Sequence, residues 1–205
     1  MKHFSKLFSV LIVTVATSAA AQVTLEEADD VMNNRNTELQ AFQDRLNDPD
    51  PERALAILKL LIVKGDADQR RMAIRHGLQS TDSAIRATTV RAILDSEPTI
   101  VITFDPVSEE PDGYYARTIA QAGGIVAEDG TSEVTRNIAG FDDEEECWTY
   151  KQGVYTPCLA MMRGEVVSIL FGGTWGSYTL NSKGELEGQQ TITGNLAKGV
   201  IELYE

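Results

Sequence analysis

Three consecutive stretches of sixteen residues decide the architecture of the first half of this chain. Residues 50–65 read DPERALAILKLLIVKG, residues 66–81 read DADQRRMAIRHGLQST, and residues 82–97 read DSAIRATTVRAILDSE. Each begins with an aspartate, which caps a helix by accepting hydrogen bonds from the unpaired N–H groups of the first turn. Apolar residues follow at three- and four-residue steps, the spacing of one helix face. The sequence therefore predicts helices over 51–63, 67–78 and 83–94, with Leu58, Ile74 and Val90 buried at equivalent positions.

This pattern resembles HEAT-like helical repeats, in which an Asp at the helix start precedes an Arg about one turn later. Two of the three segments carry that pair, as Asp66/Arg70 and Asp82/Arg86. The first segment departs from it, because Ala54 follows Asp50. The resemblance covers residues 49–96 only, and it implies an architecture, a stack of helices, rather than an activity.

Upstream, residues 1–21 have the three-part plan of a secretory signal. Lys2 and Lys6 precede an apolar stretch over 7–16, and three alanines end it at position 21. We expect cleavage there and a mature protein in the bacterial periplasm or secreted, with no membrane-spanning segment. Removal of the two lysines takes the net charge from −13 to −15. A helix is expected over 23–47, begun by a Thr24–Glu27 capping box.

After Pro98 the sequence changes from helical periodicity to short β-branched and aromatic runs separated by glycine-containing turns. A strand is expected over 99–104 and a short helix over 114–122. Further strands are expected over 125–128, 132–138, 145–151, 154–162, 165–171, 174–180, 185–193 and 199–204. The predicted fold class is α+β, with a helical domain over 22–98 and a β-rich domain over 99–205. The β part is expected to be a mainly antiparallel sandwich or open barrel.

The only two cysteines, Cys147 and Cys158, flank a predicted hairpin. A turn at Gln152-Gly153 would place the two cysteines directly opposite each other, at a separation that suits a disulfide. A redox-active pair is the alternative, but the Cys-x-x-Cys spacing is absent.

The sequence offers few sets of residues that could form a catalytic site. His76 is the only histidine of the expected mature chain, and no phosphate-binding glycine motif is present. We therefore expect no enzyme, no cofactor and no His/Cys metal site. The acidic run 142–146 leaves calcium binding or a carboxylate-only hydrolase as lesser alternatives. The net charge argues against nucleic acid, because phosphate contacts need a basic surface.

Two groups of side chains are candidates for binding. The first is a ladder of cations at equivalent repeat positions, which could dock an acidic protein: Lys59, Arg70, Arg75, Arg86 and Arg91. Within it, Arg75 and Arg91 have no acid four residues earlier, and we expect both to be exposed on one side of the stack. The second is a set of aromatic residues that could stack on a saccharide or envelope polymer: Trp148, Tyr150, Trp175 and Tyr178. The leading hypothesis is a non-enzymatic protein-interaction module that binds another periplasmic or envelope protein, and the alternative is saccharide binding by the β-rich domain.

Overall fold

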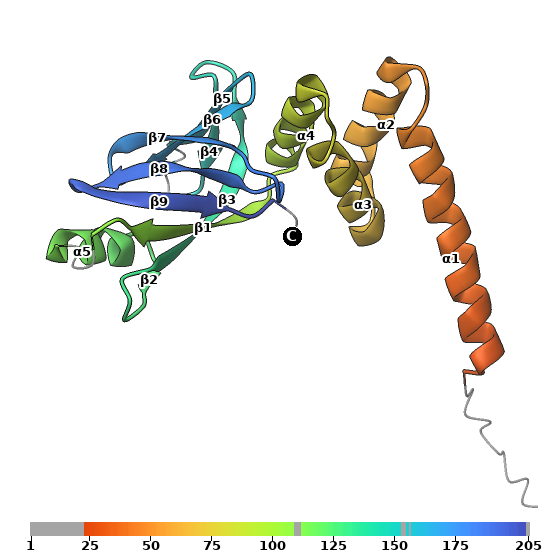
Figure 1. Ribbon diagram of the computed structural model, residues 1–205, viewed down its shortest axis with the longest axis horizontal. Helices are drawn as coiled ribbons and strands as arrows, with labels where there is room; N and C mark the ends of the chain where they lie inside the picture. Colours follow the sequence, from red (N-terminus) through yellow and green to blue (C-terminus); the bar gives the residue numbers. More distant parts are fainter. Residues whose placement is uncertain (1–22, 109–111, 153–154, 156, 204–205) are drawn as a thin grey trace, which may run out of the picture. The chain divides into compact units, whose positions relative to one another are not determined.

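The computed structural model describes residues 23–108, 112–152, 155 and 157–203 (Figure 1). The expected signal segment 1–21 lies outside these residues. The chain divides into two units, Met1–Thr37 and Glu38–Glu205. Helix α1 (Leu25–Leu46) begins in the first unit and ends in the second. Its capping box forms as predicted, because the Thr24 amide donates to Glu27 Oε2 and the Glu27 amide donates to Thr24 Oγ1.

The three sixteen-residue segments form three helices with the predicted starts. These are α2 (Pro51–Lys64), α3 (Ala67–Leu78) and α4 (Ser83–Asp95), and the side chains of Asp50, Asp66 and Asp82 cap them. The helices pack against one another. The prediction that equivalent positions are buried is confirmed, since Leu58, Ile74 and Val90 are at most 2% exposed.

The second half of the chain forms an antiparallel β-barrel of eight strands, confirming the α+β class (Figure 1). Its strands are β1 (Thr99–Pro106), β3 (Ser132–Asp142), β4 (Cys147–Tyr150), β5 (Cys158–Arg163), β6 (Val166–Phe171), β7 (Thr174–Leu180), β8 (Leu186–Ile192) and β9 (Asn195–Ile201). From β3 to β9, each strand pairs with the strand that follows it in the chain. Strand β1 pairs with both β9 and β3. The barrel is therefore closed rather than open. A two-residue strand, β2 (Ile125–Val126), is added to β3.

Helix α5 (Gly113–Gln121) lies at one end of the barrel, where it buries Tyr115 and Ile119 (Figure 1). The Tyr115 hydroxyl and Ser132 Oγ, which is on β3, are 2.8 Å apart and hydrogen-bonded. Burial raises the pKa of Tyr115. One continuous apolar core runs from Leu46 through α2–α4 and the barrel to Leu203.

Two predictions for the β part differ from the structure. The strand expected over 199–204 begins earlier, at Asn195, so Gly199 lies inside β9, where the Tyr178 ring leaves no room for a side chain. The Cys147–Cys158 disulfide is present, but Cys158 pairs with Thr149 instead of Cys147. The hairpin register is shifted because Gln152 pairs with Tyr155 instead of lying in the turn, and the Cα atoms of the two cysteines are still 5.7 Å apart. The predicted turn residue Gly153 lies outside the described residues.

Candidate functional site

A groove of about 500 Å³ lies between α4 and the loop that joins β3 to β4. Arg91 from α4 and the rings of Phe141 and Trp148 line it together with Met161 and Met162 of β5. Acidic side chains of the β3–β4 loop and Arg163 complete its rim. Methionine is flexible and polarizable, so this surface can adapt to the shape of an apolar side chain.

Arg91 contacts two of the rings that line this groove. Its guanidinium carbon lies 5.2 Å from the ring centroid of Phe141 and 5.3 Å from that of Trp148, within the range of cation–π attraction. Its Nε lies 4.0 Å from Asp95 Oδ2, one helical turn further along α4. The side chain is nevertheless 53% exposed. Arg91 is therefore positioned in advance and still accessible to a ligand.

Asp95 also contacts Trp148, whose ring lines the groove. Trp148 is 1% exposed, and its indole N–H donates to Asp95 Oδ1 at 2.9 Å. The rings of Phe141 and Trp148 meet edge to face at 4.9 Å. The Asp95 carboxylate thus accepts a hydrogen bond from the indole and lies at ion-pair distance from the guanidinium.

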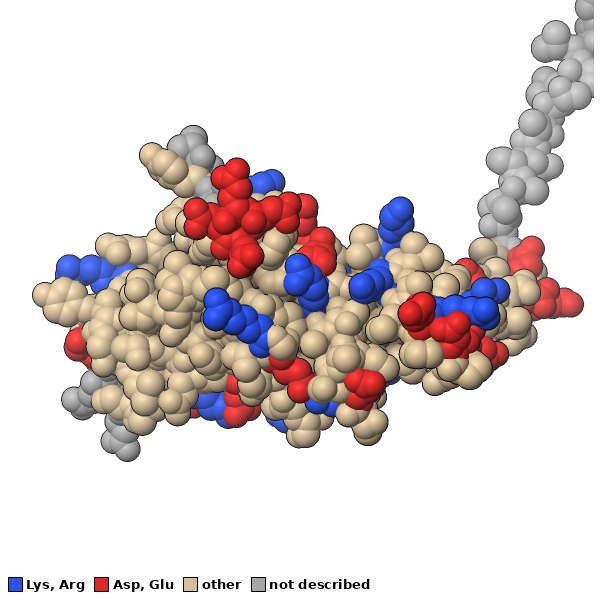
Figure 2. Space-filling view, turned by 90° about the horizontal axis from the view of Figure 1, so that it is seen from above, with Lys and Arg blue, Asp and Glu red and all other residues tan. Residues whose placement is uncertain are grey.

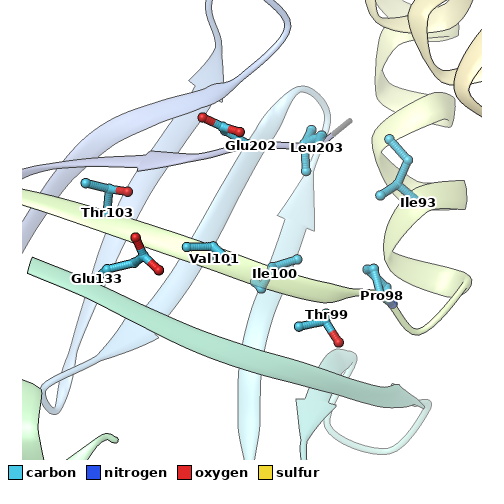
Figure 3. A pocket seen from close by; sticks show the side chains of 9 residues that line it. All are labelled: Ile93, Pro98, Thr99, Ile100, Val101, Thr103, Glu133, Glu202 and Leu203. Carbon is cyan, nitrogen blue, oxygen red and sulfur yellow. The ribbon is translucent and has the colours of Figure 1, made fainter. Parts of the chain in front are cut away.

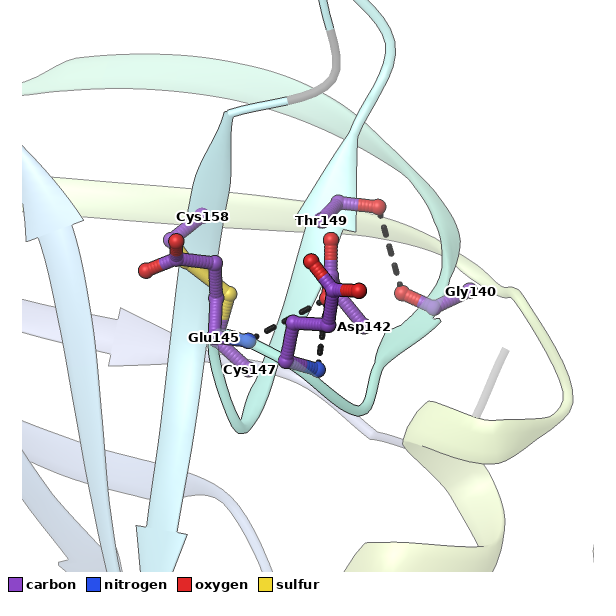
Figure 4. Close-up of a disulfide and its surroundings, with 7 residues drawn as sticks. Gly140, Asp142, Glu145, Cys147, Thr149 and Cys158 are labelled. Carbon is purple, nitrogen blue, oxygen red and sulfur yellow. Dashed lines mark hydrogen bonds between the residues drawn. A yellow bond between two sulfur atoms is a disulfide. The ribbon is translucent and has the colours of Figure 1, made fainter.

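The β3–β4 loop supplies the acidic side of the groove. Asp142 Oδ1 accepts hydrogen bonds from the amides of Glu144 and Glu145, and the disulfide anchors the strand that follows (Figure 4). Residues 143–146 are exposed, and Figure 2 shows acidic side chains gathered in one dense patch on the surface. Within the described ranges, no group of three or more His, Cys, Asp or Glu residues is placed to hold a metal ion.

The structure places the cations of the predicted ladder in different surroundings. Arg86 forms an ion pair with Glu165 at 2.6 Å, and Arg70 donates to Ser96 Oγ at 2.7 Å. Lys59 and Arg75 are exposed, and Arg75 lines a hollow beside the C-terminal half of α1 instead of the Arg91 groove. Arg75 and Arg91 are both exposed as predicted, but they line separate hollows.

The four candidate aromatic residues are also separated. Trp148 and Tyr178 are buried in the core, and burial raises the pKa of Tyr178. Tyr150 is half-buried, with the Arg136 guanidinium 5.1 Å from its ring centroid. Trp175 is 43% exposed. The rings of Trp148 and Tyr178 therefore present no open face on which a sugar could stack.

A smaller depression of about 260 Å³ runs along β1 and contains Glu133 and Glu202 (Figure 3). Glu133 lies on β3 and Glu202 directly follows β9, so the two carboxylates lie on either side of β1, and both are exposed. The carboxylate-only hydrolase therefore stays a hypothesis from the sequence.

The sequence pointed to Arg91 and Trp148 but not to the residues that join them. Asp95 stands four residues after Arg91, a spacing at which helical side chains meet, and this signal could have identified the pair. Phe141 and the methionines come from strands that only barrel closure brings beside α4. No family model matches the chain, and no curated protein or solved structure matches it significantly.

Proposed function

We propose that this protein is a non-enzymatic interaction module of the periplasm or another secretory compartment, and that a partner protein docks in the Arg91 groove. The observation that carries the proposal is Arg91, which lies over two rings and within 4.0 Å of a carboxylate yet is more than half exposed. Preorganisation favours binding because less side-chain freedom is lost when the partner arrives.

The groove suits a partner segment with three features. A carboxylate of the partner would accept hydrogen bonds from Arg91, whose planar guanidinium can donate two at once. An apolar side chain would contact Met161 and Met162. A cation would lie beside the exposed acids of the β3–β4 loop, and such charges mainly steer the approach of a partner.

The proposed compartment is supported by the expected signal segment and by the disulfide, since disulfides persist in oxidising compartments. None of the described helices is long and apolar enough to cross a membrane.

The test is a crosslinking pull-down from a periplasmic extract of the source cells, with purified wild-type protein and two variants. Arg91→Ala should lose most of a specific crosslinked partner, while Arg75→Ala should retain it, because Arg75 lines a different hollow. Equal capture by all three proteins, or equal loss from both variants, would contradict the assignment of the groove.

A further inference from the structure

The first unit of the chain carries an apolar helix face with no described side chains packed over it. Leu25, Ala28 and Met32 follow one another at steps of three and four residues along α1, so they share one face. Leu25 is 86% exposed and Met32 is 56% exposed, and the neighbouring Val31 is 68% exposed. The capping box at Thr24 and Glu27 specifies this helix start locally. We call Leu25, Ala28 and Met32 the α1 stripe.

The stripe continues a seam that is used for packing further along the same helix. The alternation of three and four residues continues through Arg35 to Leu39, Phe42 and Leu46, which gives three heptads of the spacing found in helix–helix packing. In the second unit, Leu46 is buried and Phe42 packs against the core. The same residue types at the same spacing are left in water in the first unit.

Charge decides which occupant suits the stripe. Glu26, Glu27, Asp29 and Asp30 surround it, and residues 23–37 contain one cation, Arg35. A second copy would bring two acidic helices together on a chain that already carries −13. An anionic membrane surface would also be repelled, because helices that lie on such membranes carry Lys and Arg on the polar face.

We propose that the α1 stripe docks an amphipathic helix of a partner protein whose polar flanks are rich in Lys and Arg. The apolar face of that helix would cover Leu25 and Met32, and its cations would lie beside the four acids. This site is independent of the Arg91 groove, and it stands if the groove proposal fails.

The probe is a synthetic helical peptide of three heptads with Leu at the seam positions and Lys beside them, compared with a peptide that carries Glu in place of Lys. Binding to the full chain is measured by fluorescence anisotropy of the labelled peptide. We expect the Lys peptide to bind at least ten times more tightly than the Glu peptide. The double variant Leu25→Ser, Met32→Ser should weaken Lys-peptide binding at least tenfold. Because this variant keeps every charge, its loss of binding isolates the apolar contact from general attraction to an acidic protein.

The matched control is Asn33→Ser, Asn34→Ser, which changes two exposed polar residues of the same helix and should bind like the wild type. Unchanged binding by the stripe variant would overturn the proposal. A wild-type dimer in sedimentation that the stripe variant abolishes would overturn it in favour of self-association. A marked loss of thermal stability in the stripe variant would overturn it in favour of packing within the chain.

Discussion

Asp95→Ala should destabilise the protein through the buried indole of Trp148. Without the carboxylate, the indole N–H loses its acceptor at a position where the side chain is 1% exposed. Leaving a buried donor unpaired costs about 1–3 kcal/mol. The Asp95 side chain is 43% exposed, so water can replace part of the bond, and we expect the lower half of that range, about 1–1.5 kcal/mol. For a chain of this size this corresponds to a fall in melting temperature of roughly 2–6 °C.

Asp95→Asn is the control that isolates the acceptor. Asp95 is the last residue of α4, where a negative charge opposes the helix dipole, and both substitutions remove that charge. Only Asn keeps an oxygen for the indole, so Asp95→Asn should cost less than half of what Asp95→Ala costs. The free energies of unfolding are compared by urea titration followed by far-UV circular dichroism. Equal losses for the two variants, or no loss for Asp95→Ala, would refute the proposed role of the hydrogen bond.

Three further changes test other parts of the structure. Replacing both cysteines by alanine should lower the free energy of unfolding by about 3 kcal/mol, measured by urea titration, and adding reductant to the wild type should reproduce the loss. Gly199→Ala places a methyl group against the buried Tyr178 ring and should cost about 1–3 kcal/mol in the same titration, whereas Gly113→Ala, which meets no neighbour, should be nearly neutral. Hydrogen bonds from the Tyr115 amide and the Asn195 side chain lower the pKa of Asp112, so its contribution to stability is present above its ordinary pKa of 3.8 and is lost as the pH falls through the lowered value. Asn is also a good helix cap, so Asp112→Asn should leave stability at neutral pH nearly unchanged and reduce the loss on acidification, as read from melting temperatures against pH.

The helical half could be predicted in detail because its signals are local. A capping aspartate and the first turn that it caps are neighbours in the chain, so Asp50, Asp66 and Asp82 locate three helix starts without knowledge of the rest of the fold. The strands could be located as well, because their alternating pattern is also local. The exception is β9, which begins at Asn195 instead of at residue 199.

The groove could not be predicted as a whole because its parts meet only through non-local pairing. Alternation along β4 places Trp148 and Tyr150 on one face, but it does not show which face becomes the interior. That depends on closure of the barrel by the β1–β3 pair, which joins residues 28 to 38 apart in the chain. The hairpin register was missed at its turn, because Gln152 was expected to be a turn residue but pairs with Tyr155, which shifts the facing pairs that follow. The bulge beside Trp148 then shifts the register once more.

The position of Trp148 gives the groove a built-in optical reporter. The chain has two tryptophans, Trp148 beneath Arg91 and the partly exposed Trp175 on β7, and their emission should differ because one indole is dry and the other is in contact with water. Replacing Trp175 by phenylalanine leaves a single emitter 5.3 Å from the Arg91 guanidinium. A ligand that moves Arg91 or displaces water from the groove then changes the electric field at that indole and with it the fluorescence emission. Occupancy of the groove can therefore be followed without an attached dye.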